Sequence, residues 1–520
     1  MDKVREHSRD EPYHLYVWNN NVDDPWVAQF LAPAADATLV NRERMALVRG
    51  HPVQGSLQHA MCLQRLYEAA RLNGANYIVT LDTDAHPIRD GWLRELTSAL
   101  NRKTVLAGVW RDELAPAIEP YVHPSCLCTT AEFIEANKLR LDYLPGDSTT
   151  RYDTLSCLTE KARQLGLNCH ALRRSNRNQM HRLMGGIYGD LIYHHAAGSR
   201  RTIMFWGDRR SQELERWNQY LRDQLNVLLF AHHDRYINWL RGTQDFVFVL
   251  GMHRSGTSCL AGALEACGLF LGDVSRANPY NERGNHELPS VVTLHEEILR
   301  SNGGSWSAPP PRISVNSAQQ QAIRDVAAKL SAHAPCGLKE PRMLLFVEHW
   351  LDVAGPGKMV ASFRHPGAVA QSLARRDQMP EAQAHELWLR YNRRLIELHR
   401  QHGFPLLEFD LSNVDAYCAT VAGAAVRLGL DPRVHRVREF VSRELDHSDA
   451  AQQPVPAVCR ETYEYLMAHR YQPDPFEKLV VEMAGQRDLQ PLPPPAEPGQ
   501  DGGKRKRPYL NRLRQLLGKR

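Results

Sequence analysis

The 520-residue sequence contains no apolar run long enough to span a membrane. Its N-terminus, which begins Met1-Asp-Lys-Val-Arg-Glu6, does not have the pattern of a secretory signal peptide. The ten cysteines are scattered, and Cys126-Leu-Cys128 has no second pair at the spacing of a zinc site. We therefore expect a cytoplasmic protein whose cysteines are reduced thiols.

The sequence also lacks a strong excess of charge and any repeat of solenoid length. It has 64 Lys and Arg against 59 Asp and Glu, which gives a net charge of +5. This balance suits anionic small molecules, and we expect no nucleic acid as a partner. The length and the 43% hydrophobic content predict two or three globular domains.

The most informative stretch is Phe246-Val-Phe-Val-Leu-Gly-Met-His-Arg-Ser-Gly-Thr-Ser-Cys-Leu260. Residues 246–250 predict a buried strand, and the apolar period after Gly256 predicts a helix that Gly268 ends. The amide groups of the helix N-terminus and the charge of Arg254 would converge on one anion. The predicted phosphate or sulfate site consists of Met252, His253, Arg254, Ser255, Gly256, Thr257 and Ser258.

No lysine stands between Gly251 and Leu260, and Thr257 occupies the place of the lysine in a nucleoside-triphosphate P-loop. This disfavours a P-loop small-molecule kinase, which is the alternative from another class of enzyme. The sequence Arg254-Ser-Gly-Thr-Ser258 instead resembles the 5′-phosphosulfate loop of sulfotransferases, which use 3′-phosphoadenosine 5′-phosphosulfate (PAPS). The resemblance implies PAPS as the cofactor and a catalytic role for Arg254.

A second motif follows the strand predicted at 359–363. Arg364 stands at the carboxyl end of that strand, where open α/β sheets bind ligands, and Ser372 lies on the next helix. These two residues resemble the 3′-phosphate motif of sulfotransferases. Lys339 and Arg342 resemble the basic residues of the Lys-Asp-Pro-Arg stretch of that family. The resemblance implies that all four residues bind the cofactor.

The residues before the next predicted helix resemble an Asn-Pro…Gly-aromatic-Glu stretch of bacterial sulfotransferases, with His286 in the place of the aromatic residue. The resemblance implies that Glu287 or His286 accepts the proton of the acceptor hydroxyl. The alternative for Glu287 is a first-turn carboxylate facing the helix dipole. Arg375 and Arg376 are interpreted first as a solvated helix face, and the alternative is that they add positive charge to the site.

The first part of the chain contains a separate candidate site. A buried strand is predicted at 77–81, and Asp82 and Asp84 follow it with their carboxylates on one side. Such a pair binds a divalent cation that carries a diphosphate, or else caps the next helix. His194 and His195, later in this part, are either metal ligands or structural groups.

The order strand, Asn/Asp turn, helix, strand, Asp-x-Asp resembles the GT-A glycosyltransferase fold, which binds nucleotide sugars through manganese or magnesium. The resemblance implies that Asp153 is the catalytic base. The metal ligands that it implies are Asp82, Asp84, His194 and His195. Only twelve residues precede Tyr13, too few for the βα unit with which that family usually begins, so we expect either an earlier start of the chain or a shortened relative. The rival interpretation is a non-catalytic glycan-binding scaffold.

We therefore expect an α/β protein, with a GT-A-like nucleotide-sugar fold followed by a P-loop-like, parallel-sheet sulfotransferase domain. The expected parts are a glycosyltransferase-like domain at 1–205, a helical connector at 206–243, a sulfotransferase domain at 244–485, and a Pro/Gly linker with a basic tail at 486–520. The amphipathic tail predicts contact with an anionic membrane face or a partner, and a frayed soluble tail is the alternative. The expected reaction is sulfuryl transfer from PAPS to a hydroxyl of a glycan or glycolipid.

Overall fold

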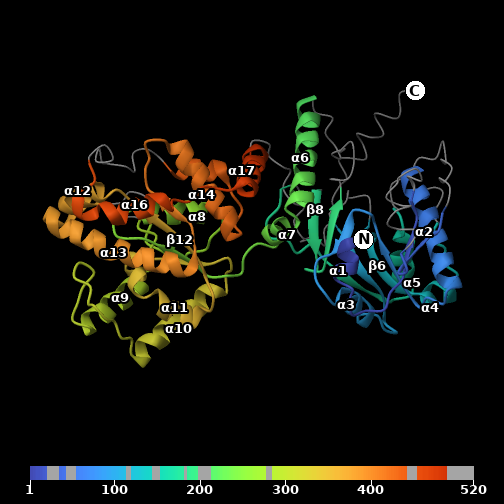
Figure 1. Cartoon of the computed structure of the whole chain (residues 1–520). Helices are drawn as coiled ribbons and strands as arrows, with labels where there is room; N and C mark the ends of the chain where they lie inside the picture. Colours follow the sequence, from blue (N-terminus) through green and yellow to red (C-terminus); the bar gives the residue numbers. More distant parts are fainter. Residues whose placement is uncertain are drawn as a thin grey trace, which may run out of the picture. The chain divides into compact units, whose positions relative to one another are not determined.

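The computed structural model describes residues 1–19, 34–41, 54–112, 119–142, 153–180, 184–196, 212–276, 284–441 and 454–488. The fold in these ranges is α/β, as predicted, with strands in four sheets and helices packed against them (Figure 1). The predicted Pro/Gly linker after 489 and the basic tail at 504–520 lie outside the described residues. Among the described residues, no helix has the length and apolar character needed to cross a bilayer.

The N-terminal part is built on a four-stranded sheet with the order β3-β6-β5-β7. Its strands are β3 (Tyr77–Leu81), β5 (Thr104–Arg111), β6 (Tyr121–Thr130) and β7 (Asn168–Leu172). Two smaller sheets pair β1 (Leu15–Val17) with β2 (Ala37–Leu39), and β4 (Ala85–Pro87) with β9 (Ile192–Ala196) and β8 (Met184–Tyr188). The helices are α1 (Asp2–Glu6), α2 (Gln54–Leu72), α3 (Trp92–Ser98), α4 (Ala131–Ala136) and α5 (Ser156–Gln164).

The register of β6 explains how one edge of this sheet collects polar groups. β6 runs antiparallel to β3, with Leu81 opposite Cys126, and antiparallel to β5, with Arg111 opposite Tyr121. Residues 121–126 all lie in β6. Pro124 is tolerated because the pairing with β5 is irregular next to it, where a missing N–H costs no ladder bond.

The predicted helical connector contains α6 (Gln212–Ala231) and α7 (His233–Arg241). Next comes the C-terminal sheet, whose order is β11-β10-β12-β13 and whose neighbouring strands are all parallel, as predicted. Its strands are β10 (Val247–Leu250), β11 (Gly337–Lys339), β12 (Lys358–Phe363) and β13 (Leu406–Glu408). Its helices are α8 (Thr257–Ala266), α9 (Pro289–Ser301), α10 (Ser317–Ser331), α11 (Val347–Ala354), α12 (Pro366–Asp377), α13 (Glu381–His402), α14 (Val414–Leu428), α15 (Val434–Phe440), α16 (Arg460–Ala468) and α17 (Pro475–Asp488), with 3₁₀ turns η3 (Pro341–Leu345) and η6 (Ala457–Cys459).

Both faces of the C-terminal sheet are covered by helices, which is why β10 is apolar at every position. Phe248 and Leu250 pack into a core with α9, α10, α11 and α13, whereas Val247 and Val249 pack into another with α8, α14 and α15. The parallel strands therefore open to solvent mainly at their ends. The loops after β10, β11 and β12 meet at the carboxyl edge, where ligands bind in such sheets.

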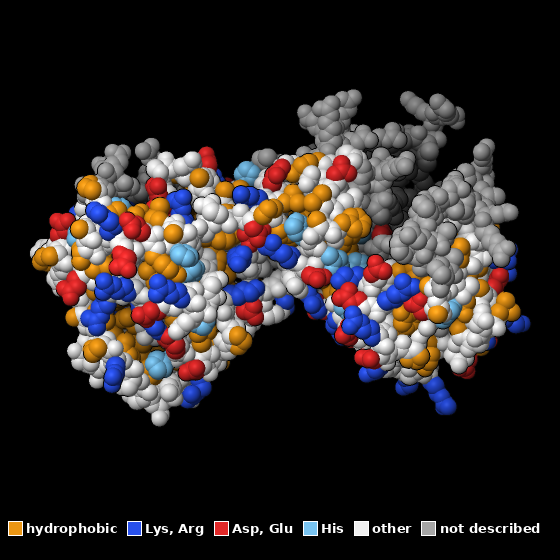
Figure 2. Space-filling model, viewed as in Figure 1, with side chains coloured by type: hydrophobic (Ala, Val, Ile, Leu, Met, Phe, Trp, Pro, Cys, Tyr) orange, Lys and Arg blue, Asp and Glu red, His pale blue; other side chains and the backbone are white. Residues whose placement is uncertain are grey.

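Charged side chains of both signs are mixed on the face of the described residues that Figure 2 shows. On the visible face of the described residues, Lys and Arg alternate with Asp and Glu side chains (Figure 2). This distribution agrees with the near balance of charges in the sequence.

Gly251, directly after β10, is required by both its backbone angle and its neighbours. Its φ is 143°, and a Cβ there would lie 2.4 Å from the carbonyl oxygen of Ser362. We expect Gly251→Ala to lower the free energy of unfolding by about 1–3 kcal/mol, because the loop must move away from β12. Urea unfolding measures this change.

Gly485, inside α17, provides the matched control for that substitution. A Cβ at Gly485 would meet nothing closer than 3.9 Å. Gly485→Ala should be neutral or stabilise the protein by up to about 1 kcal/mol, since alanine favours the helix. Equal urea midpoints for the two variants would contradict the strain assigned to Gly251.

Candidate functional site

The loop between β10 and α8, which the sequence predicts to bind an anion, turns tightly and runs into the N-terminus of α8. Arg254 and Gly256 have positive φ angles of 65° and 81°, which turn the chain tightly before α8. The hydroxyl of Ser362 on β12 donates to the carbonyl of Ser255 over 2.6 Å and fixes the loop to the sheet. The Ser255 hydroxyl is buried and has no hydrogen-bond partner. This polar atom and the start of α8 suit the phosphate end of a nucleotide.

The two motifs predicted to hold a nucleotide lie together in the structure. Arg254 Nε donates to the hydroxyl of Ser372 over 2.7 Å, which links the loop to α12. Arg364 lies at the end of β12, where its Nη1 is 3.4 Å from the carbonyl oxygen of Arg254. Its guanidinium lies 5.1 Å from the centre of the Phe409 ring, a cation–π contact. Two arginines 110 residues apart in the sequence thus face one place.

Arg376 was interpreted from the sequence as part of a solvated helix face, and this interpretation is wrong. Its side chain is only 25% exposed and lies 5.5 Å from the centre of the Trp306 ring. It follows Ser372 by one helical turn, so both residues share one face of α12. The missed signal is that spacing, which brings Arg376 to the face that carries the predicted phosphate contact. Arg375, by contrast, is exposed, as predicted.

The crowding of cations changes the acid–base properties of Arg254. Burial, together with the positive charges of Arg376 and Arg364, lowers the pKa of Arg254 to about 10. In the described part of the chain, no carboxylate forms an ion pair with Arg254. A bound anion would stabilise a guanidinium in this position, which among the described residues has only the more distant carboxylate of Asp377 acting on it.

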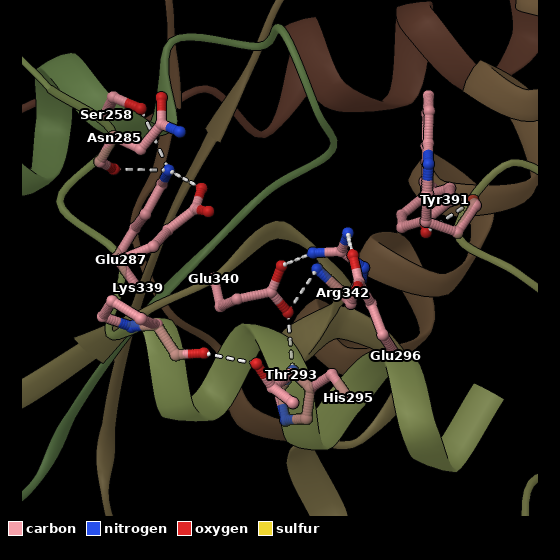
Figure 3. A network of polar contacts seen from close by, with 12 residues as sticks. Ser258, Asn285, Glu287, Thr293, His295, Glu296, Lys339, Glu340, Arg342 and Tyr391 are labelled. Atoms are coloured by element: carbon pink, nitrogen blue, oxygen red, sulfur yellow. Dashed lines mark hydrogen bonds and ion pairs between the residues drawn. The ribbon is translucent and has the colours of Figure 1, made fainter. Parts of the chain in front are cut away.

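Lys339 is almost completely buried and connects the anion loop to Glu287 (Figure 3). Its ammonium group donates to the hydroxyl of Ser258 over 2.9 Å, to the carbonyl of Asn285 over 2.8 Å, and to a carboxylate oxygen of Glu287 over 2.6 Å. The three donors of the ammonium are therefore all used. Lys339 positions Glu287 beside the first turn of α8.

Glu287 and His286 point to different partners. Glu287 precedes α9, which begins at Pro289, so it is not the first-turn carboxylate of the alternative interpretation. His286 is 3% exposed, and its Nδ1 lies 3.1 Å from Glu265, the carboxylate that Arg276 also binds. Of the two candidate bases, Glu287 is the one linked to the anion loop, through the ammonium of Lys339, which also bonds to Ser258.

Arg342, another predicted cofactor ligand, is held in a buried network beside that cluster (Figure 3). Its two terminal nitrogens donate to Glu340 and Glu296. His295 accepts from the indole of Trp350 at Nε2, so its Nδ1 carries the proton donated to Glu340 over 2.6 Å. Burial alone would raise the pKa of Glu340, but His295 and Arg342 hold it well below its usual value. The guanidinium is therefore oriented by carboxylates.

Three further residues of the predicted loop, Met252, His253 and Thr257, are buried. Met252 is fully buried in the apolar core. His253 is buried beneath Trp306, with ring centres 4.6 Å apart, and burial holds its pKa well below the usual value. Thr257 is buried at the N-terminus of α8, where its methyl group lies against Gly251.

In the N-terminal part, Asp82, His123 and His194 form a cluster whose candidate ligand atoms lie within 4.8 Å of one another. Asp82 follows β3, and His123 and His194 lie on β6 and β9. His194 was predicted, but His123 was missed. The available signal was its place near the start of the strand that pairs with the end of β3.

The other residues predicted for this site are arranged around the cluster. Asp84 lies 3.5 Å from His194, whereas His195 bonds to the hydroxyl of Tyr193 over 2.7 Å and stays outside the cluster. Asp153 accepts from the buried hydroxyl of Tyr121 over 2.9 Å. His59, which sequence reasoning missed, lies 3.1 Å from Asp82, and hydrogen bonding to Asp82 raises its pKa although burial acts to lower it.

The cluster fits a divalent cation by distance but not by the positions of its protons. Arg111 can only donate, so its contact of 3.3 Å makes Nδ1 of His194 an acceptor. The amide of Ser125 likewise donates to Nδ1 of His123 over 3.1 Å. A neutral imidazole whose Nδ1 accepts carries its proton on Nε2 and cannot bind a metal through that atom.

Comparisons with known proteins do not assign the chain to a family. No family model and no curated protein matches it. Among solved structures, the sulfotransferase domain from the Synechococcus PCC 7002 olefin synthase is similar over 48% of this chain and 95% of its own length, at 18% identity and a TM-score of 0.20. A likeness at that TM-score carries no weight for function.

The pair of Glu265 and His286 predicts a dependence of stability on pH. Burial alone would raise the pKa of Glu265, but His286 and Arg276 lower it from 4.5 to about 2. Its stabilising effect is therefore complete above the unfolded value of 4.5 and is lost as pH falls toward 2. Glu265→Gln should lose about 1–2 kcal/mol of unfolding free energy above that window and much less within it.

Urea unfolding of both proteins across this pH range measures the difference. Glu381→Gln is the control, because its carboxylate is 80% exposed. A difference between wild type and Glu265→Gln that stays constant down to the lower end of the window would contradict the assigned pKa.

Proposed function

We propose that this protein is a PAPS-dependent sulfotransferase that transfers the sulfuryl group to a hydroxyl of a glycan or glycolipid. The observation that carries the proposal is the approach of Arg364 and Arg376 to Arg254 beside a glycine-turned loop and a helix N-terminus. Arg376 pairs with Asp377, but three guanidiniums against this one carboxylate still leave an excess of positive charge, which favours a ligand with more than one negative charge. PAPS carries a 5′-phosphosulfate and a 3′-phosphate.

The residues divide the work of binding. The amides of residues 252–258, with Arg254 and Ser255, would hold the 5′-phosphosulfate, and Arg364 with Ser372 would hold the 3′-phosphate. Arg376 lies on the same face of α12 and adds charge there. The cofactor would supply a sulfuryl group on a good leaving group, in position for in-line displacement.

Glu287 is the base that we propose for the acceptor hydroxyl. Its carboxylate is bonded to Lys339, which also bonds to Ser258 at the start of α8. Lys339 thus holds the carboxylate beside the anion loop, where it can accept the hydroxyl proton as the new oxygen–sulfur bond forms. Arg254 offsets the charge that develops on the departing phosphate. His286 is the other candidate base, although its described bonds lead to Glu265.

The N-terminal part would serve the same glycan chemistry. We propose three parts for the chain: a glycosyltransferase-like domain at 1–205, a helical connector at 206–243 and the sulfotransferase domain at 244–485. A glycosyltransferase there would need a nucleotide sugar, a divalent metal and Asp153 as its base. The proton positions at His123 and His194 favour the rival, a non-catalytic glycan-binding scaffold. A P-loop kinase remains disfavoured because the anion loop has no lysine.

The 3′-phosphate contact predicts a preference between nucleotides. We expect wild type to bind 3′-phosphoadenosine 5′-phosphate roughly ten- to a hundred-fold more tightly than 5′-AMP, which lacks the partner of Arg364. Arg364→Ala should remove most of this preference, and Arg376→Ala should weaken the bisphosphate more than 5′-AMP. Titration calorimetry gives the affinities.

Arg375→Ala is the matched control, because Arg375 is the exposed neighbour of Arg376 on α12. It should leave both affinities nearly unchanged. If wild type binds 5′-AMP as tightly as the bisphosphate, the loop serves another phosphate ligand and the sulfotransferase proposal is wrong.

A base at Glu287 predicts loss of turnover without loss of cofactor binding. Glu287→Gln should lower kcat roughly a hundred-fold or more while the affinity for 3′-phosphoadenosine 5′-phosphate stays close to that of wild type. Glu296→Gln is the control carboxylate, since it bonds to Arg342 in the neighbouring network. Wild-type kcat in Glu287→Gln would assign the base to another group.

A further inference from the structure

The side chain of His253 carries an unmet polar atom inside the anion loop. The residue lies between Met252, which is part of the core, and Arg254, and it is 8% exposed. Its Nε2 is buried and has no hydrogen-bond partner among the described residues. Buried polar atoms are nearly always hydrogen-bonded, so Nε2 indicates a bound group that the described residues do not supply.

Aromatic packing fixes the ring of His253 in one position. The indole of Trp306 lies against it, with ring centres 4.6 Å apart, and the ring of Tyr391 meets it edge-on at 6.0 Å. The hydroxyl of Tyr391 donates to the carbonyl of Trp306 over 2.9 Å, which ties α13 to the loop that carries the indole. A polar atom held in this way is oriented before a ligand binds.

Charges from both parts of the candidate site act on His253. Arg376 belongs to the arginine cluster, whereas Lys339 holds Glu287 (Figure 3). Burial holds the pKa of His253 well below its usual value, and the nearby cations act in the same direction while Glu340 opposes them. The imidazole is therefore neutral at neutral pH, with one N–H group and one lone pair.

The group that is transferred must lie between the phosphate bound by the arginines and the base that takes the proton of the acceptor. His253 is the loop residue whose ring is close enough to both sides to be affected by their charges. The oxygen atoms of a sulfuryl group only accept hydrogen bonds, so a neutral imidazole must meet them with its N–H group.

We propose that His253 is a further catalytic residue, whose Nε2–H donates a hydrogen bond to the sulfuryl group of PAPS. This assignment rests on the proposed sulfotransferase function. The loop amides and Arg254 bind the phosphosulfate as a whole, whereas the side chain of His253 contacts the part of it that is transferred.

The neutral state of His253 suits the transfer step. The acceptor oxygen bonds to sulfur as the bond between sulfur and the bridging phosphate oxygen breaks. Glu287 takes the hydroxyl proton, and the electron pair of the broken bond leaves with 3′-phosphoadenosine 5′-phosphate. Negative charge therefore grows on the bridging oxygen, where Arg254 offsets it. A neutral donor orients the sulfuryl group without a full charge that would stabilise bound PAPS as much as the transition state.

Titration calorimetry on the full chain, without an acceptor, tests the contact. The ligands are PAPS and 3′-phosphoadenosine 5′-phosphate, which lacks the sulfuryl group. His253→Phe keeps an aromatic ring against Trp306 but removes the donor. It should weaken PAPS binding roughly ten-fold or more and leave the bisphosphate within about two-fold of wild type. A purely structural role of His253 would weaken both ligands alike.

Two amide variants locate the donor at Nε2. The amide nitrogen of glutamine can reach the position of Nε2, whereas the shorter asparagine reaches only that of Nδ1. His253→Gln should therefore keep most of the PAPS affinity, and His253→Asn should lose it as His253→Phe does. The control is His435→Phe on α15, because His435 is exposed, and it should bind both ligands as wild type does.

Circular dichroism checks that each variant is folded. The proposal is overturned if folded His253→Phe binds PAPS as wild type does, if it weakens both ligands equally, or if the glutamine and asparagine variants bind PAPS equally well. When wild type still prefers the bisphosphate to 5′-AMP, any of these results removes the role of His253 and leaves the sulfotransferase proposal standing. Loss of that wild-type preference would remove both.

Discussion

The repulsion among guanidiniums at the carboxyl edge of the parallel sheet is the constraint around which the C-terminal part is arranged. Arg254, Arg364 and Arg376 come from three separate segments, and the fold brings them together although like charges repel. Such an arrangement costs stability unless an anion joins it. Two contacts hold these cations in place before the anion binds. Ser362 on β12 bonds to the loop that carries Arg254, and the ring of Phe409 packs against Arg364.

Of the acidic groups nearby, only Asp377 pairs with a residue of this cluster, Arg376, among the described residues. Glu340 and Glu296 are both bound to Arg342, and Glu287 is bound to Lys339. These three carboxylates are therefore paired with cations outside the cluster. The same pairing places Glu287 next to the anion loop, so the network that keeps acid away from the phosphate site also positions the proposed base.

The sequence predicted the parts of the fold that depend on local pattern. The predictions of a strand at 77–81 and of a parallel C-terminal sheet were correct, because apolar runs, glycine positions and strand ends are local signals. What could not be predicted depends on tertiary pairing. His123 reaches Asp82 only through the register of β6 on β3, and Arg376 is covered by Trp306 from a distant loop.

The proton positions in the N-terminal cluster also depend on contacts between residues that are far apart in the sequence. The sequence Asp82-Thr-Asp84 and the pair His194-His195 predicted a metal site, yet Arg111 on β5 fixes the proton of His194 on the atom that would bind the metal. His195, adjacent in sequence, is directed to Tyr193 instead.

The most direct test of the central claim is incubation of the protein with sulfur-labelled PAPS and a pool of glycans and glycolipids from a lysate. The account predicts label in a carbohydrate-containing product, formed by wild type and lost in Arg254→Ala. Label that stays in PAPS or is released only as free sulfate, with no labelled acceptor, would contradict it.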